Sequence, residues 1–156
     1  MKLSGSYAFD IASQNVFDAL LDPSILQSSI PGCVAAWHAD ENHMKVRLML
    51  PLPLPGLEGP YDVSVRVKEQ EPPRMLLLLA ERRGRIGGTV ETLTHITLTD
   101  KELGTSSLLA YETQGKLEGP IAAADNPLIQ QIIVHSLNTF FKNLNAILSQ
   151  TAHSRV

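Results

Sequence analysis

The chain has 156 residues, a length that fits one folded domain with a single hydrophobic core. Its 13 Lys and Arg against 16 Asp and Glu give a formal net charge of −3, which argues against a protein that binds nucleic acid without sequence preference, because such a protein needs clustered cations. Hydrophobic residues make up 44% and charged residues 19%, a globular balance that excludes a disordered chain.

The sequence predicts a cytoplasmic protein. Cys33 is the only cysteine, so no internal disulfide indicates an oxidising compartment. The first residues, from Met1 to Ser6, lack the apolar stretch of a signal peptide. No apolar run approaches the ~18 residues of a membrane-spanning helix.

The first elements are a strand and two short helices. Apolar and polar residues alternate from Leu3 to Ile11, which predicts a half-buried strand. Ser13 offers a side-chain oxygen that can cap a helix, and apolar residues recur at helical spacing up to Asp22. A second short helix is expected before Pro31 and Gly32, which favour a change of direction.

Six strand-like runs follow, separated by turn residues, and they predict an antiparallel meander. Alternation is cleanest in the third run, where Tyr61, Val63 and Val65 share one face. The six runs are Val34–Ala39, His43–Leu50, Tyr61–Lys68, Arg74–Arg82, Thr89–Thr99 and Thr105–Thr113.

The last element is a long helix. Asp125 or Asn126 can cap it, Pro127 suits its first turn, and an apolar stripe continues to about Ser149. The fold class predicted is α+β: a seven-stranded antiparallel curved sheet wrapped around the long C-terminal helix, with two short helices between the first two strands. We expect residues 1–150 to form this domain and residues 151–156 to form a C-terminal tail.

A sheet that curves around a helix leaves a wedge, and aromatic residues are only 5% of the chain, so we expect an internal apolar pocket. The alternative is a wedge filled by leucine and isoleucine. Tyr61, Tyr111 and Thr92 would supply hydroxyls that orient a ligand. The residues expected to line the pocket are Trp37, Leu48, Leu50, Tyr61, Val63, Leu77, Leu79, Thr92, Tyr111, Ile129, Ile133 and Phe140.

Three connections are expected at one end of the sheet, around residues 51–60, 82–88 and 115–126, because hairpin tips alternate between ends. This end is the predicted mouth of the pocket. Its first loop would present leucines to a partner, a membrane surface or the pocket as a lid, unless it folds back on the core. Its second loop would present arginines to an anionic group, unless it is an ordinary solvated hairpin. The residues concerned are Leu52, Leu54, Leu57, Arg82, Arg83 and Arg85.

Catalytic signals are weak. No nucleotide-binding loop or nucleophile elbow occurs, so no cofactor is predicted. His95 and Glu91 share one strand face and would form an acid/base pair if that face pointed inward. His38 and His43 flank a turn where they could face each other, but no third ligand is evident, so no metal site is predicted. Cys33 has apolar neighbours and is expected to be structural.

Three segments resemble a known family. They are the opening Leu3-Ser4-Gly5-Ser6-Tyr7, the segment Asn15-Val16-Phe17-Asp18-Ala19-Leu20-Leu21-Asp22-Pro23 and the turn Ser29-Ile30-Pro31-Gly32-Cys33. Together they resemble the CoxG family of carbon monoxide dehydrogenase subunits, within the START-like, birch-pollen-allergen-like (SRPBCC) superfamily. The resemblance runs from Leu3 to about Leu148. It implies a helix-grip fold with the element order derived above.

The resemblance implies a small accessory protein that holds an apolar molecule, a lipid or a quinone, between the long helix and the sheet. Some relatives work with molybdenum hydroxylases at the membrane, so such an enzyme and a peripheral membrane contact are the partners implied. Two alternatives stay open. One is a START-like cyclase or hydratase acting on an aromatic or polyketide-like substrate through His95 or Glu91. The other is an assembly factor with a vestigial pocket.

Overall fold

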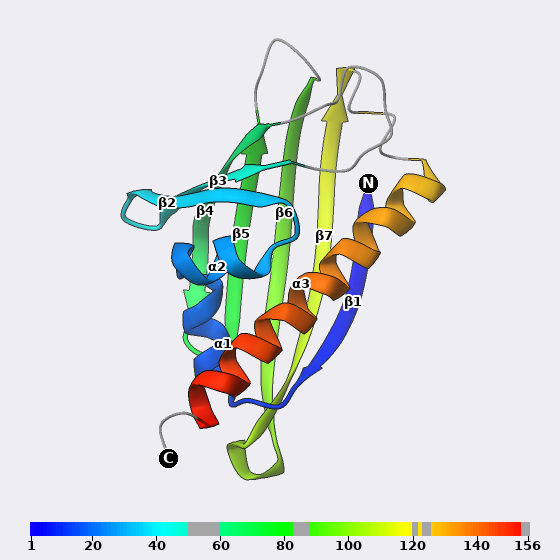
Figure 1. The fold of residues 1–156 in the computed structure, drawn as a ribbon. Helices are drawn as coiled ribbons and strands as arrows, with labels where there is room; N and C mark the ends of the chain where they lie inside the picture. Colours follow the sequence, from blue (N-terminus) through cyan, green and yellow to red (C-terminus); the bar gives the residue numbers. More distant parts are fainter. Residues whose placement is uncertain (50–59, 83–87, 120–121, 123–125, 154–156) are drawn as a thin grey trace.

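The computed structural model of the chain describes residues 1–49, 60–82, 88–119, 122 and 126–153, with side chains up to residue 150. The element order predicted from the sequence is confirmed (Figure 1). The elements are β1 (Lys2–Phe9), α1 (Ser13–Leu20), α2 (Pro23–Ser29), β2 (Cys33–Asp40), β3 (His43–Leu48), β4 (Tyr61–Glu71), β5 (Met75–Arg82), β6 (Thr89–Lys101), the 3-10 turn η1 (Glu102–Gly104), β7 (Ser106–Glu118) and α3 (Pro127–His153).

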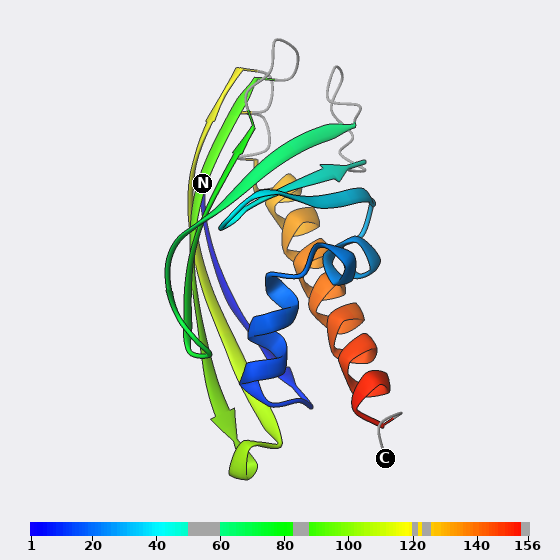
Figure 2. The ribbon, with the colours of Figure 1, turned by 90° about the vertical axis from the view of Figure 1, so that its left-hand side faces the viewer.

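The seven strands form one antiparallel sheet in the order β1-β7-β6-β5-β4-β3-β2. The sheet is curved, and β2 and β3 cross toward the side on which α3 lies (Figure 2). All three helices lie on this concave side, so one face of the sheet is covered and the other faces solvent. We call these the inner face and the outer face.

The register shows which residues belong to the inner face. Leu76 of β5 pairs with Ile96 of β6, and Ile96 pairs with Tyr111 of β7. Tyr111 in turn pairs with Gly5 of β1. Since side chains alternate along each strand, every second residue counted from these positions also points inward.

The short helices are fixed by local and long-range contacts. Asp22 accepts hydrogen bonds from the Ser24 and Ile25 amides and so caps α2, as its sequence chemistry favours. The predicted Ser13 cap of α1 is wrong: no side chain caps α1 from its N-cap position, and the Ser13 amide donates instead to Oδ1 of Asp100 in β6, at 2.9 Å. A partner 87 residues away replaces the local cap.

Buried side chains divide the space between the sheet and α3 into two regions. The larger is the lower core, in which Leu76, Leu109 and Leu144 are completely buried. The smaller is the upper cluster, which lies toward the first turns of α3. It consists of Tyr61, Val90, Leu117, Ile129, Ile132 and Ile133.

The last strand is longer than the sequence indicated. The alternation ends near Thr113, but β7 continues to Glu118. Pairing explains the difference, since the Gly115 amide donates to the Met1 carbonyl and the β6 ladder reaches Glu118. The space at Gly115 is tight, because a Cβ would lie 2.9 Å from Cγ2 of Thr92 and 3.3 Å from Cε of Met1, and those side chains would have to shift.

Candidate functional site

The candidate site is the upper cluster and the inner sheet face around it. The ends of β3, β5 and β7 and the start of α3 lie at the same end of the molecule (Figure 1). The described residues that flank the three predicted mouth loops therefore come together there. This is the arrangement that alternating hairpins predict.

Side chains at this end are inward-facing but incompletely covered. Among the described residues, Tyr61 and Ile129 are the buried members of the upper cluster, at 4% and 6% exposed. Val90, Leu117 and Ile133 point into the same space and stay partly exposed. In a close-packed interior, apolar side chains that face a helix are fully covered. The partial exposure of these three side chains therefore shows that solvent still reaches the interior at this end.

A row of hydroxyl groups lies between the upper cluster and the lower core. Oγ1 of Thr94 and Oγ1 of Thr113 are 2.9 Å apart across β6 and β7. Thr92 follows on the same face, and Tyr111 lies next to Thr113 on the inward-facing row of β7. Burial raises the pKa of the Tyr111 phenol above its ordinary value, so this hydroxyl stays protonated and can donate a hydrogen bond.

Most residues predicted to line the pocket lie on the inner face. On the sheet these are Leu48, Tyr61, Val63, Thr92 and Tyr111. On α3, Ile129 and Ile133 belong to the upper cluster, whereas Phe140 packs against the lower core. Leu50 lies outside the described residues.

Three predicted lining residues are on the wrong face. Leu77 pairs with His95, and Leu79 pairs with Leu93, so both leucines belong to the outer face. The run from Leu76 to Leu79 is apolar on both faces, and alternation therefore could not choose between them.

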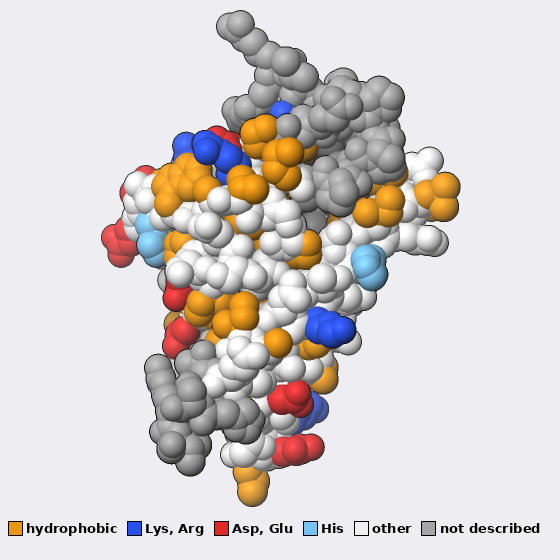
Figure 3. All heavy atoms as spheres, in the orientation of Figure 1, with side chains coloured by type: hydrophobic (Ala, Val, Ile, Leu, Met, Phe, Trp, Pro, Cys, Tyr) orange, Lys and Arg blue, Asp and Glu red, His pale blue; other side chains and the backbone are white. Residues whose placement is uncertain are grey.

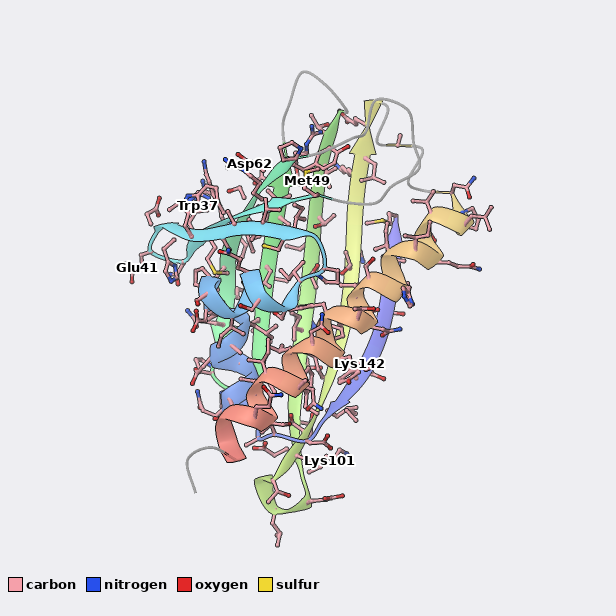
Figure 4. The ribbon with its side chains drawn as sticks, viewed as in Figure 1. Trp37, Glu41, Met49, Asp62, Lys101 and Lys142 are labelled. Atoms are coloured by element: carbon pink, nitrogen blue, oxygen red, sulfur yellow. The ribbon has the colours of Figure 1, made fainter. Side chains whose placement is uncertain are left out.

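Trp37 is the third. It pairs with Lys45, and the Arg47 guanidinium lies 5.5 Å from its ring. Arg47 also holds Asp62 through two hydrogen bonds of 2.8 and 3.3 Å, which keeps the pKa of the Asp62 carboxyl below its usual value. Figure 4 shows Trp37 on the β2–β3 hairpin, away from α3.

The predicted mouth residues are only partly described. Leu52, Leu54, Leu57, Arg83 and Arg85 lie outside the described residues. Arg82 is described and departs from the expectation of a solvated tip: it is the last residue of β5, it pairs with Val90, and it belongs to the inner face. The alternation already indicated this, because Arg82 is two residues from Ala80 and six from Leu76.

The alternative catalytic pair faces solvent. His95 and Glu91 are exposed on the outer face, opposite in direction to Thr92 and Thr94. An acid/base role in the space below α3 is therefore excluded for this pair. Thr92, which the sequence placed in the pocket lining, and Thr94 lie on the inner row instead.

His38 and His43 do not face each other. His38 pairs with Met44, the neighbour of His43, so the two imidazoles point to opposite faces of the hairpin. The His43 ring is buried, with Nε2 hydrogen-bonded to Ser64 Oγ and Nδ1 3.5 Å from an Asp40 carboxylate oxygen. These contacts join the β2–β3 turn to β4.

Cys33 is partly buried, and burial raises the pKa of its thiol while a hydrogen bond to the Ala35 carbonyl lowers it by less. A thiol with a raised pKa is a poor nucleophile at neutral pH. This environment favours the structural role that the sequence predicts.

Exposed apolar side chains surround the open end. Val34 and Met49 are 50% and 46% exposed, and Leu128 in the first turn of α3 is 70% exposed. Hydrophobic side chains gather at this end in Figure 3, over β2 and β3 and near the start of α3. Both the upper cluster and the protein surface next to it are therefore apolar.

These features define a class of protein: a curved antiparallel sheet gripping one long helix, with an apolar and incompletely covered inner face at one end. Solved structures share this architecture. A conserved protein from Geobacillus kaustophilus superposes with a TM-score of 0.85 at 24% identity, covering 97% of each chain. A protein from Thermus thermophilus superposes with a TM-score of 0.70 at 10% identity, covering 97% of this chain and 99% of the other. A START superfamily protein from Mycobacterium smegmatis gives 0.67 at 10% identity, covering 96% and 98%.

The fold is therefore START-like. The family model of CoxG, a carbon monoxide dehydrogenase subunit, matches residues 5–149, and the chain belongs to that family. No curated protein sequence matches the chain significantly. None of the helices in the described part of the chain is both long and apolar enough to cross a membrane.

Proposed function

We propose that this protein binds an apolar small molecule, a lipid or a quinone, between the upper inner face of the sheet and the first half of α3. The observation that carries the proposal is the incomplete burial of an inward-facing apolar surface. Val90, Leu117 and Ile133 face the helix side of the sheet and remain partly exposed. A ligand that covered them would remove apolar area from water.

The expected driving force is hydrophobic. Each methylene that leaves water contributes about 0.8 kcal/mol, so an acyl or isoprenoid chain of moderate length supplies enough free energy for stable binding. The hydroxyls of Thr92, Thr94 and Thr113 and the phenol of Tyr111 supply polar groups on this face. Sparse polar groups in an apolar site orient a ligand and select its polar end.

The proposed biological role is that of an accessory protein. Membership of the CoxG family of carbon monoxide dehydrogenase subunits supports a molybdenum hydroxylase as the partner, and the apolar surface around Val34, Met49 and Leu128 supports a peripheral contact with a membrane. In this role the protein would carry its ligand between the enzyme and the bilayer.

Copurification tests the ligand part of the proposal. The protein purified from its own host is analysed by native mass spectrometry, and any bound small molecule is then extracted and identified. A stoichiometric lipid or quinone is the expected result. A protein that is empty and gains no thermal stability from a panel of apolar ligands would contradict the proposal, because a ligand that binds the folded state must stabilise it.

A matched pair of substitutions tests the location. Ala80 is half-buried on the inner face opposite Thr92, whereas Ala110 is exposed on the outer face of β7. Ala80→Trp fills the proposed site and is expected to weaken ligand binding at least about tenfold, as overpacking of an occupied space does. Ala110→Trp adds the same side chain to solvent and should leave binding unchanged. Equal effects of the two substitutions would place the ligand elsewhere.

The partner role has its own test. Leu52, Leu54 and Leu57 together changed to Ser should reduce recovery of the enzyme partner and association with liposomes, while ligand binding persists. If both associations survive the triple change, the predicted role of this loop is wrong.

A further inference from the structure

Three side chains that carry acid–base or nucleophilic groups meet on the outer face of the sheet, at the β2–β3 hairpin. His43, the first residue of β3, is 6% exposed. Its Nε2 is hydrogen-bonded to Oγ of Ser64 in β4, and its Nδ1 lies 3.5 Å from a carboxylate oxygen of Asp40, the last residue of β2. A carboxylate, an imidazole and a hydroxyl therefore follow one another in a row, on the face opposite to the upper cluster.

The strand register brings these three groups together. His43 pairs with Arg66, and Ser64 lies two residues before Arg66, so the His43 and Ser64 side chains point to the same face of neighbouring strands. Asp40 pairs with His43 across the hairpin, which puts its carboxylate beside the imidazole. The row is thus positioned by the backbone pairing of three strands.

The two nitrogens of the His43 ring have different surroundings. Nδ1 is buried and makes no hydrogen bond with any residue that the structure describes. A carboxylate near Nδ1 favours the tautomer with the proton on that nitrogen, which leaves the Nε2 lone pair to accept the Ser64 hydroxyl proton. The separation of 3.5 Å from Asp40 is longer than an ordinary hydrogen bond, but catalytic contacts of this kind tighten when a substrate binds. This tautomer makes His43 a base directed at Ser64.

Ser64 is reached by solvent, whereas His43 behind it is buried. Ser64 is half-buried and lines an open depression of about 350 Å³ on the outer face. A small molecule in this depression would touch the serine hydroxyl while the imidazole stays shielded from water. The charged side chains that share the lining are Lys45, Asp62, Arg66 and Glu81.

Positive charge next to Ser64 suits a developing oxyanion. Lys45 pairs directly with Ser64 across β3 and β4, and Arg66 is the next outward residue of β4. Arg47 binds Asp62 through two hydrogen bonds, so the charge of this acidic neighbour is compensated. Cations held beside a reacting carbonyl stabilise the negative charge that forms in the transition state of acyl transfer.

We propose that Ser64, His43 and Asp40 form a second site, which hydrolyses small carboxylic esters. Oγ of Ser64 bonds to the acyl carbon while Nε2 of His43 takes the hydroxyl proton, and the bond to the leaving alcohol breaks as the alcohol takes that proton from Nε2. Water then attacks the acyl-serine, and His43 accepts a proton from the water and returns it to Oγ of Ser64 as the free acid leaves. Asp40 is a positioning residue that orients the imidazole. A depression of this size is at the small end for ligand sites, so esters of short acids are the expected substrates.

Ester turnover and covalent labelling test the site in the unaltered protein. p-Nitrophenyl acetate is an ester of the expected size, and the release of p-nitrophenol measures its hydrolysis. A fluorophosphonate probe forms a stable bond to an activated serine Oγ and releases fluoride. We expect repeated turnover of the ester and probe attachment at Ser64, located by peptide mass spectrometry. Acetyl groups that accumulate only on lysines or the N-terminus, with no probe on Ser64, would overturn the proposal, because amines react with this ester without any base beside them.

Substitutions then assign the roles. Ser64→Ala removes the nucleophile and should lower the rate of ester hydrolysis at least about hundredfold. Ser6→Ala, the matched control, removes an exposed hydroxyl from the outer face of β1 and should leave the rate unchanged. Asp40→Asn should lower kcat at least about tenfold while KM stays the same, since Asp40 acts through the imidazole and does not touch the ester. Asp40→Glu keeps a carboxylate and should recover most of the rate.

Probe labelling needs no variant, so the proposal stays falsifiable even if Ser64→Ala fails to fold. An unlabelled Ser64 in the unaltered protein, or hydrolysis that persists in Ser64→Ala, overturns the proposal. The proposed apolar-ligand site lies on the opposite face of the sheet, so neither result would affect it.

Discussion

The lower core and the upper cluster are built from the same strands and the same helix, but they are packed differently. The lower core contains all four phenylalanines of the chain, Phe9, Phe17, Phe140 and Phe141, together with Tyr7 and Tyr111. The Phe141 ring contacts those of Tyr7, Phe9, Tyr111 and Phe140, and Phe9 and Phe141 are centred 6.1 Å apart. The corresponding inward positions above them are small: Ala80, Thr92 and Gly115.

The difference shows that side-chain size, and not the curvature of the sheet alone, determines where space remains. Six of the eight aromatic residues of the chain lie in or against the lower core. The end that they fill stabilises the fold, and the end that they leave is the proposed ligand site. Each of the following predictions tests this division.

Leucines along α3 provide the largest expected contrast. Leu144 is 0% exposed in the lower core and Leu128 is 70% exposed in the first turn, while Leu137 between them is partly buried. Leu144→Ala should lower the free energy of unfolding by about 3–5 kcal/mol, because it leaves a cavity in a close-packed region. Leu137→Ala should cost roughly half as much, and Leu128→Ala less than about 0.5 kcal/mol.

Urea unfolding of the three variants measures these costs. Alanine replaces leucine in every case, so differences in helix propensity cancel. A Leu137→Ala cost equal to that of Leu144→Ala would mean that close packing extends toward the start of α3, and the division would then be wrong.

The boundary between the two regions is tested at Gly5. A Cβ at this position would lie 2.7 Å from Oη and 2.9 Å from Cζ of Tyr111, whose ring packs against Phe141. Gly5→Ala must displace the ring and should cost about 1–3 kcal/mol, as other overpacked cores do. In a Tyr111→Leu background the same change should cost much less, since the clashing atoms are gone.

Ser6→Ala is the matched control, because Ser6 is the next residue and points outward. Its expected cost is below about 0.5 kcal/mol. A Gly5→Ala cost that is the same with and without the Tyr111 ring would show that the glycine is needed for another reason.

The sequence predicted the element order and the inner row of β6 because both depend on local alternation. Val90, Ile96 and Leu98 fall on one row of this run, and Glu91, His95 and Thr97 fall on the other, so the first row is the more apolar one and is favoured for burial. The same argument predicted a curved sheet wrapped around the long helix, since two short helices, a meander and one long helix have few ways to bury their apolar faces. The START-like assignment came from the resemblance to the CoxG family.

Other features could not be predicted from local patterns, because they depend on how distant segments of the chain pair. Leu77 and Leu79 look identical to Leu76 and Leu78 in sequence, and pairing with β6 alone decides which pair is inside. The cap of α1 comes from Asp100, which no local pattern connects to Ser13. The placement of Arg82 was accessible to period-two counting from Ala80, but its charge favoured a solvated tip.

The smallest expected effect concerns the ionisation of Tyr111. Burial raises the pKa of this phenol above its ordinary value of 10.0. The unfolded chain therefore loses the phenolic proton at a lower pH than the folded protein does, so the contribution of this group to stability is complete below the unfolded pKa and is lost as the pH rises through the folded pKa. The wild-type protein should accordingly lose stability more steeply with rising pH than Tyr111→Phe, which has no proton to lose. Urea midpoints of both proteins between about pH 8 and about pH 11 measure the two slopes. Parallel slopes would mean that water reaches the phenol freely, which would move the boundary of the open region from the threonine row down into the lower core.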